Sequence, residues 1–190
     1  MATDTPVEDE LNPEQQEKLL AFARETIRMY LTERKLPPAE TSEPIFLQNR
    51  AVFVTLHLQG RLRGCIGTLE AHLPLGEAVR EYAVAAATQD PRFRPVSPAE
   101  VPHLELEISV LSPMRRVATP EEVQIGKHGI CVRRGSRSGV FLPQVAPEQG
   151  WDLETTLTTL CVEKAGLPGD AWKTGAEILC FTAQVFGEGD

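Results

Sequence analysis

The feature that most constrains the fold is a run of strictly alternating residues followed by a glycine turn. Within residues 51–59, large aliphatic side chains occupy every second position: Val52, Val54, Leu56 and Leu58. A period of two is typical of a β-strand with one buried face. Gly60 then permits a tight turn into a second strand over residues 62–67. The sequence therefore predicts an antiparallel hairpin that must cover its apolar face with another layer.

Two segments with helical periodicity supply that layer. Asn12-Pro13-Glu14-Gln15 combines an N-cap, a proline suited to the first turn and a glutamine that can close a capping box. This pattern predicts a helix over residues 14–34. Residues 75–89 form a second, alanine-rich amphipathic segment, and alanine allows close approach of a neighbouring element. We expect both helices to pack on the hairpin.

The remaining elements indicate the fold class. Alternation predicts a strand at 104–110. Two further strands, 129–134 and 139–142, are expected to be joined by a turn, and 178–186 is expected to be the last strand. Asp152 is placed to cap a helix that ends before Gly166. The order shows no regular β-α-β repeat, which favours an α+β fold with a mostly antiparallel sheet flanked by helices. We expect a disordered acidic tail at residues 1–11, followed by a single domain over 12–187.

Composition excludes several functional classes. The net charge of the 190 residues is −8, and residues 61–137 hold eleven Lys and Arg against nine Asp and Glu. An acidic chain with an arginine-rich middle argues against nucleic-acid binding, although it permits a local anion site. No apolar run approaches the ~18 residues of a membrane span. The acidic start differs from a signal peptide, so we expect a cytoplasmic protein with no membrane partner.

Cysteine and histidine spacing argues against a metal or cofactor. The four cysteines lie far apart with no C-x-x-C pair, and the four histidines form no H-x-x-x-H pair. The phosphate-binding, dinucleotide-binding and hydrolase-elbow motifs are absent as well. We expect free thiols, no bound metal and no cofactor.

The segment around Cys65 is the strongest candidate for chemistry. Gly64 and Gly67 leave its backbone accessible, and the neighbouring Arg61 and Arg63 could raise the thiolate fraction. Simple alternation places Arg63, Cys65 and Gly67 on one face of the strand. A nucleophilic cysteine and a small packed residue both fit this pattern, and spacing alone leaves them open.

Other polar residues also have two interpretations. Arg92, in Asp90-Pro91-Arg92-Phe93, could bind an anion, or the segment could be a structural turn. The arginine-rich hairpin at 133–139 could cradle an anion or simply be solvated. Glu105 and Glu107 lie on the same face of a predicted strand, where they could act as paired carboxylates or simply form a solvent-exposed face. His57 could be an acid–base group or an ordinary surface residue.

Several short motifs spread over residues 15–187 resemble one known family. They are Phe53-Val54-Thr55-Leu56, Leu62-Arg63-Gly64-Cys65-Ile66-Gly67, Asp90-Pro91-Arg92-Phe93, Ile108-Ser109-Val110-Leu111, Val132-Arg133-Arg134-Gly135, Leu142-Pro143-Gln144-Val145, Gly150-Trp151 and Lys164-Ala165-Gly166-Leu167. The most specific is the six-residue motif that contains Cys65. On these motifs the chain resembles the AMMECR domain family, whose bacterial and archaeal members are called AmmeMemoRadiSam system protein A.

The resemblance implies a two-lobed α+β fold. A larger lobe would combine the N- and C-terminal parts, a smaller lobe would come from the middle of the chain, and a cleft would lie between them. It also implies that the protein works with a radical-SAM protein and with a Memo-like protein that resembles non-haem metal dioxygenases. It implies no particular reaction.

Two functional expectations follow. In the first, the protein is a non-catalytic adaptor or small-molecule carrier for those two partners. In the second, it is a cytosolic enzyme in which Cys65 attacks a small anionic substrate bound by Arg63 and Arg92, with Gly64 and Gly67 allowing close approach. The sequence does not decide whether the protein is an enzyme.

Overall fold

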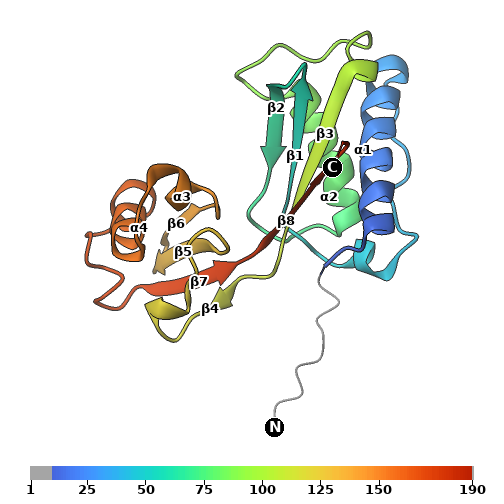
Figure 1. Ribbon diagram of the computed structural model, residues 1–190. Helices are drawn as coiled ribbons and strands as arrows, with labels where there is room; N and C mark the ends of the chain where they lie inside the picture. Colours follow the sequence, from blue (N-terminus) through green and yellow to red (C-terminus); the bar gives the residue numbers. More distant parts are fainter. Residues whose placement is uncertain (1–9, 190) are drawn as a thin grey trace. The chain divides into compact units, whose positions relative to one another are not determined.

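The computed structural model describes residues 10–189, and its contacts divide the chain into two compact units. Unit 1 comprises Met1–Leu111 and Gln184–Asp190, and unit 2 comprises Ser112–Ala183. Each unit is built around its own four-stranded antiparallel sheet (Figure 1). The fold is α+β, as the sequence predicts, but the strands form two separate sheets. The expected interlobe cleft stays a prediction.

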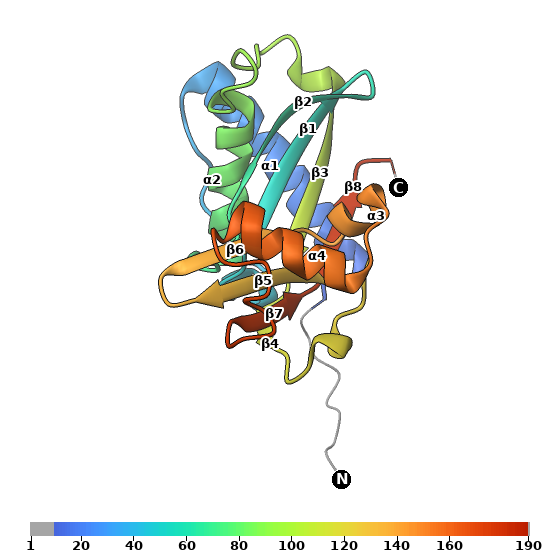
Figure 2. The ribbon, with the colours of Figure 1, turned by 90° about the vertical axis from the view of Figure 1, so that its left-hand side faces the viewer.

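Unit 1 is a sheet with two long helices on one face (Figures 1 and 2). Its elements are α1 (Pro13–Glu33), β1 (Val52–Leu58), β2 (Arg61–Gly67), α2 (Leu75–Thr88), β3 (Leu104–Leu111) and β8 (Ala183–Gly187), with short 3-10 turns at Pro44–Leu47 and Val101–His103. The strand order is β2-β1-β3-β8. The hairpin packs on α2, whereas α1 packs mainly on α2 and β3.

Local sequence signals explain both helices. Asn12 and Gln15 form the predicted capping box at the start of α1. From there Leu19, Ala23 and Ile27 enter the core at helical spacing and are almost fully buried. Alanines on α2 allow the helix to lie close to the sheet, and the layer between helices and strands forms one hydrophobic core.

The N-terminal boundary differs from the prediction. Leu11, which we assigned to the disordered tail, is only 3% exposed. Its backbone N–H donates to the Gln184 side chain at 2.8 Å, and its carbonyl accepts from the Gln184 amide at 2.8 Å. Leu11 therefore belongs to the folded core, because a distant β8 residue satisfies its backbone. Residues 1–9 of the predicted tail lie outside the described residues.

Unit 2 packs short helices on the second sheet. Its elements are β4 (Arg115–Arg116), a 3-10 turn at Pro120–Glu122, β5 (Gly129–Arg134), β6 (Arg137–Phe141), α3 (Val145–Gln149), α4 (Leu153–Thr159), a π-helical turn at Leu160–Lys164 and β7 (Glu177–Phe181). The strand order is β4-β7-β5-β6. Leu157, Leu160 and Cys161 are fully buried in a separate hydrophobic core.

The predicted strand at 178–186 is in fact two strands. β7 pairs with β5 in unit 2, whereas β8 pairs with β3 in unit 1. Thr182 lies at the break, where its N–H donates to the Ser112 side chain and its carbonyl accepts from the Ser112 backbone, both at 2.9 Å. The prediction of one strand was wrong because an apolar stretch of sequence indicates burial but not which sheet buries it.

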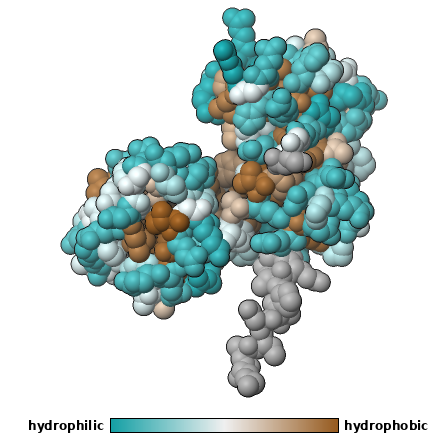
Figure 3. Space-filling model, in the orientation of Figure 1, coloured by the Kyte–Doolittle hydropathy of each residue, from teal (hydrophilic) through white to brown (hydrophobic). Residues whose placement is uncertain are grey.

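The surface of both units is largely hydrophilic, with small apolar patches on each (Figure 3). Among residues 10–189, no helix is long and apolar enough to cross a membrane.

Candidate functional site

A β-bulge determines which way the side chains of β2 point. Leu56 of β1 pairs with Gly64, but the next residue, His57, pairs with Leu62, so Arg63 is left without a partner in the register. The regular alternation that the sequence predicts over residues 62–67 is therefore interrupted at Arg63. Cys65 pairs with Thr55, which places both side chains on the sheet face opposite the helices.

Cys65 belongs to a polar row on that face. Thr55 pairs with Cys65 on one side and with Glu107 of β3 on the other, and all three residues are half-buried. The Thr55 hydroxyl donates to the Cys65 sulfur at 3.1 Å. A hydroxyl is a poor base at neutral pH, so this contact orients the Cys65 sulfur without supplying a general base.

A buried carboxylate fixes the backbone at Cys65. Asp90 follows α2 and its side chain is only 2% exposed. Its Oδ2 accepts the backbone N–H of Cys65 at 2.9 Å, and its Oδ1 accepts the backbone N–H of Arg92 at 3.1 Å. One side chain thus connects β2 to the loop that follows α2.

The same carboxylate holds the guanidinium of Arg92. Arg92 Nε and Nη2 donate to the two Asp90 oxygens at 3.0 and 2.7 Å, a bidentate ion pair. Arg92 holds the pKa of Asp90 well below its ordinary value, although burial acts in the opposite direction. The pKa of Arg92 is raised, first by this hydrogen bond and, to a lesser degree, by the nearby Cys65 sulfur.

The outer edge of Arg92 is exposed. Its side chain is 55% accessible, and its guanidinium lies over the Phe93 ring at 5.5 Å. Within the described part of the chain, Arg92 Nη1 has no hydrogen-bond acceptor. Two neighbouring groups therefore hold a cation in a fixed orientation beside Cys65, with donors still available to a carboxylate or phosphate.

Arg63 has a different role from Arg92. Its Nε donates to Glu100 at 2.9 Å, Nη1 donates to the Arg94 carbonyl at 2.8 Å, and Nη2 makes longer contacts to Glu100 and the Pro95 carbonyl. These bonds lower the pKa of Glu100 to about 2, the Arg63 hydrogen bond being the largest cause and the Ser97 backbone the next. Arg63 therefore holds the 94–100 loop against β2. The N–H groups of its guanidinium that make these bonds are occupied by acceptors of the protein itself.

The two candidate glycines are positioned by packing. A Cβ on Gly64 would lie 2.1 Å from the Ala86 carbonyl oxygen of α2, and one on Gly67 would lie 2.3 Å from the Val52 carbonyl oxygen. Gly64 faces the helix layer, on the other side of the sheet from Cys65. The glycines thus let β2 approach α2 and β1 closely.

The arginines of the 133–139 hairpin, the other predicted anion site, bind groups of unit 2. Arg133 pairs with Glu177, Arg134 donates to the Ala171 and Thr174 carbonyls, and Arg137 donates to the Gly166 carbonyl. The hairpin turn is also shorter than predicted, because Arg134 already pairs with Arg137. The other three cysteines are buried, and all four are unpaired.

The structure joins two of the predicted site residues, Cys65 and Arg92, through the carboxylate of Asp90. Asp90 was visible in the sequence only as part of a turn segment. Nothing in the local spacing indicates that its carboxylate reaches a backbone N–H 25 residues earlier. Thr55 was equally hidden, because its role depends on the strand register.

Comparisons with known proteins agree on one family. The AMMECR1 family model matches residues 20–186. The chain is 43% identical over 176 residues to protein Mbar_A1807 of Methanosarcina barkeri, covering 88% of this chain and 87% of the relative. It is 43% identical over 190 residues to protein MK0488 of Methanopyrus kandleri, covering 95% and 91%.

A solved structure supports the same assignment. The crystal structure of the uncharacterized protein PH0010 from Pyrococcus horikoshii superposes with a TM-score of 0.78 at 37% identity, covering 94% of each chain. Both the sequence relatives and this structure extend over nearly the whole chain, which therefore belongs to the AMMECR1 family.

Proposed function

We propose that this protein is a non-catalytic carrier and adaptor that binds a small anionic molecule beside Cys65. Arg92 is the residue that recognises the anion, through the guanidinium edge that faces away from Asp90. Cys65 and Thr55 form the adjoining polar surface. The carrier works in the cytoplasm with a radical-SAM protein and a Memo-like protein, and the family resemblance supports this pairing.

The observation that carries the proposal is the use of Asp90. One buried carboxylate fixes both the Cys65 backbone and the Arg92 guanidinium, so the site is rigid before a ligand arrives. The hydrogen-bond partner of the Cys65 sulfur is a hydroxyl and not an imidazole or carboxylate. This arrangement favours binding, since an activated thiol normally has a general base within hydrogen-bond reach.

Co-purification tests this proposal. The full chain is isolated from the cells that produce it, and bound proteins and metabolites are identified by mass spectrometry. We expect an anionic metabolite together with the two partner proteins. Arg92→Gln should lose the metabolite and keep the proteins, whereas Arg94→Gln should keep both. Arg94 is the matched control, because it is an exposed arginine in the same loop. Retention of the metabolite by Arg92→Gln would refute the proposal.

A second candidate function is an enzyme that uses Cys65 as a nucleophile on a small anionic substrate. The half-buried thiol beside the Arg92 cation favours it, because a guanidinium stabilises negative charge that develops during attack. Arg92 would take the anion-binding role, since Arg63 is held by Glu100. This function predicts a covalent adduct on Cys65 during turnover, which the carrier does not form.

A further inference from the structure

The fourth strand of the unit 1 sheet has an exposed outer edge. β8 ends the strand order β2-β1-β3-β8, and no other described strand pairs with its far side. Thr182 and Glu188 both direct backbone bonds toward the β3 side, through Ser112 and Leu106. By the two-residue period, the backbone groups of Ala183 and Val185 face outward.

This edge lacks the protection that the other sheet edges carry. β2 has Arg61 and the bulge at Arg63, β6 has Arg137, and β4 is only two residues long and consists of arginines. β8 reads Ala-Gln-Val-Phe-Gly, with no charge and no proline. Natural proteins usually protect an edge strand from pairing by means of charges, prolines, bulges or short length. An edge strand without these features is suited to pairing with another strand.

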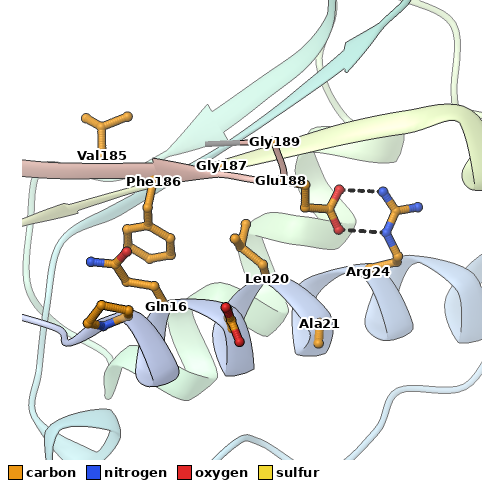
Figure 4. A pocket seen from close by; sticks show the side chains of 11 residues that line it. Gln16, Leu20, Ala21, Arg24, Val185, Phe186, Gly187, Glu188 and Gly189 are labelled. Atoms are coloured by element: carbon orange, nitrogen blue, oxygen red, sulfur yellow. Dashed lines mark hydrogen bonds and ion pairs between the residues drawn. The ribbon is translucent and has the colours of Figure 1, made fainter.

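A groove runs along β8 where it lies beside α1. It has a volume of about 620 Å³, and its apolar lining includes Pro13, Leu20, Ala21 and Phe186. Figure 4 shows Leu20 and Phe186 directed toward each other between the strand and the helix, while Val185 points away from the helix. The Val185 side chain is 53% exposed. The groove is large enough for several side chains of an extended peptide.

The charges around the groove select the kind of peptide. Arg24 and Glu188 neutralise each other through two hydrogen bonds (Figure 4). Glu17 also lines the groove and is exposed on α1. On a larger scale, the described residues of unit 1 contain fifteen Asp and Glu against eleven Lys and Arg, a balance of −4, whereas unit 2 contains eight of each. The excess negative charge of the described residues therefore lies on the unit that bears the groove, which attracts a cationic partner.

We infer that β8 and α1 form a docking site for an extended basic segment of a partner protein. The segment adds to the sheet as a strand beside β8, and its backbone bonds to the outward groups of Ala183 and Val185. Alternate side chains enter the groove, an apolar one against the exposed Pro13 and Ala21 and a lysine or arginine near Glu17. The site lies at the opposite sheet edge from Cys65. This inference rests on the proposed function in one respect, that an adaptor needs a surface that binds a partner protein. The experiment that tests it does not involve the Cys65 site.

Peptide selection tests this inference with the full chain. The probe is a phage-displayed library of random linear peptides of about twelve residues, which is long enough to span β8. We expect enriched peptides that alternate apolar residues with lysine or arginine. Hydrogen exchange of the amides at 183–187 should slow when a synthetic copy of the best peptide binds.

Two variants separate strand addition from general attraction. Val185→Pro removes an outward N–H without breaking the β3 ladder, so the protein should fold and the affinity should fall about tenfold or more. Glu17→Lys should weaken binding of the basic peptide, whereas Glu81→Lys, an exposed α2 residue with the same charge change, should not. The inference is overturned if no peptide is enriched, if Val185→Pro binds like the wild type, or if the two lysine variants behave alike. Loss of the Arg92-bound metabolite would leave all three results unchanged.

Discussion

The Asp90 carboxylate accepts the backbone N–H of Cys65 at 2.9 Å across 25 residues of sequence. The same carboxylate accepts three hydrogen bonds from Arg92. Asp90 thus holds the strand that carries Cys65 and the loop that carries Arg92 together.

Asp90→Asn should destabilise unit 1. An amide keeps one acceptor oxygen and loses the charge, so about half of the four hydrogen bonds disappear, at a cost of about 1.5–3 kcal/mol. The measurement is urea unfolding of the full chain followed by circular dichroism. Asp170→Asn, an exposed aspartate in unit 2, is the control and should change the free energy of unfolding little. Equal stability of the two variants would show that the Asp90 contacts do not support the fold.

Cys65→Ser should cost about 1 kcal/mol or less, because the swap conserves volume and the new hydroxyl keeps Thr55 as a partner. Cys161→Ser should cost about 1–3 kcal/mol, since Cys161 is fully buried and a hydroxyl loses more hydration there than a thiol does. The two losses are compared by denaturant unfolding under identical conditions. A larger loss at Cys65 than at Cys161 would make Cys65 a packing residue.

Gly64→Ala should disrupt the contact between β2 and α2. The added methyl group would lie 2.1 Å from the Ala86 carbonyl oxygen, and overpacking of this kind costs about 1–3 kcal/mol. Gly169→Ala serves as the control, because its nearest neighbours are side-chain methyl groups at 3.1 and 3.5 Å. Thermal unfolding of both variants checks this prediction. An unchanged melting temperature for Gly64→Ala would contradict the close packing.

The ion pair between Arg63 and Glu100 predicts a dependence of stability on pH. The pKa of Glu100 is about 2 in the folded protein, below the ordinary 4.5 that it regains on unfolding. Its contribution is therefore complete above pH 4.5 and is lost as the pH falls toward 2. The difference in unfolding free energy between the wild type and Glu100→Gln, measured in urea, should shrink between pH 5 and pH 3. A constant difference over that range would show that Glu100 does not have a lowered pKa in the folded protein. Asp90 is present in both the wild type and Glu100→Gln, so its own titration cancels from the difference.

Local signals predicted most of unit 1. The capping box at Asn12 and the alternation from Val52 to Leu58 set α1 and β1 within a residue or two. These signals succeed because each lies within one element and reflects burial against one layer. The predicted strand at 178–186 failed because two units share it, and Leu11 was misplaced because its partner is Gln184, far along the chain.

The candidate site was predicted in part, and the reason is physical. Cys65 and Arg92 stand out by residue type and by their motifs. Their connection depends on the register between β1 and β2 and on the bulge at Arg63, which short-range spacing does not encode. Arg63 and Arg92 are both arginines, so residue type does not separate their roles. Arg63 pairs with Glu100 because of where the fold places it.

The central claim is that Cys65 lines a binding site and does not react. It is tested most directly by native and denaturing mass spectrometry of wild type and Cys65→Ser, each purified as the full chain from the cells that produce the protein. We predict that both carry the same anionic molecule at similar occupancy, that it dissociates on denaturation, and that Cys65 keeps its unmodified mass. A covalent adduct on wild-type Cys65, or loss of the molecule from Cys65→Ser while the variant stays folded, would contradict the account.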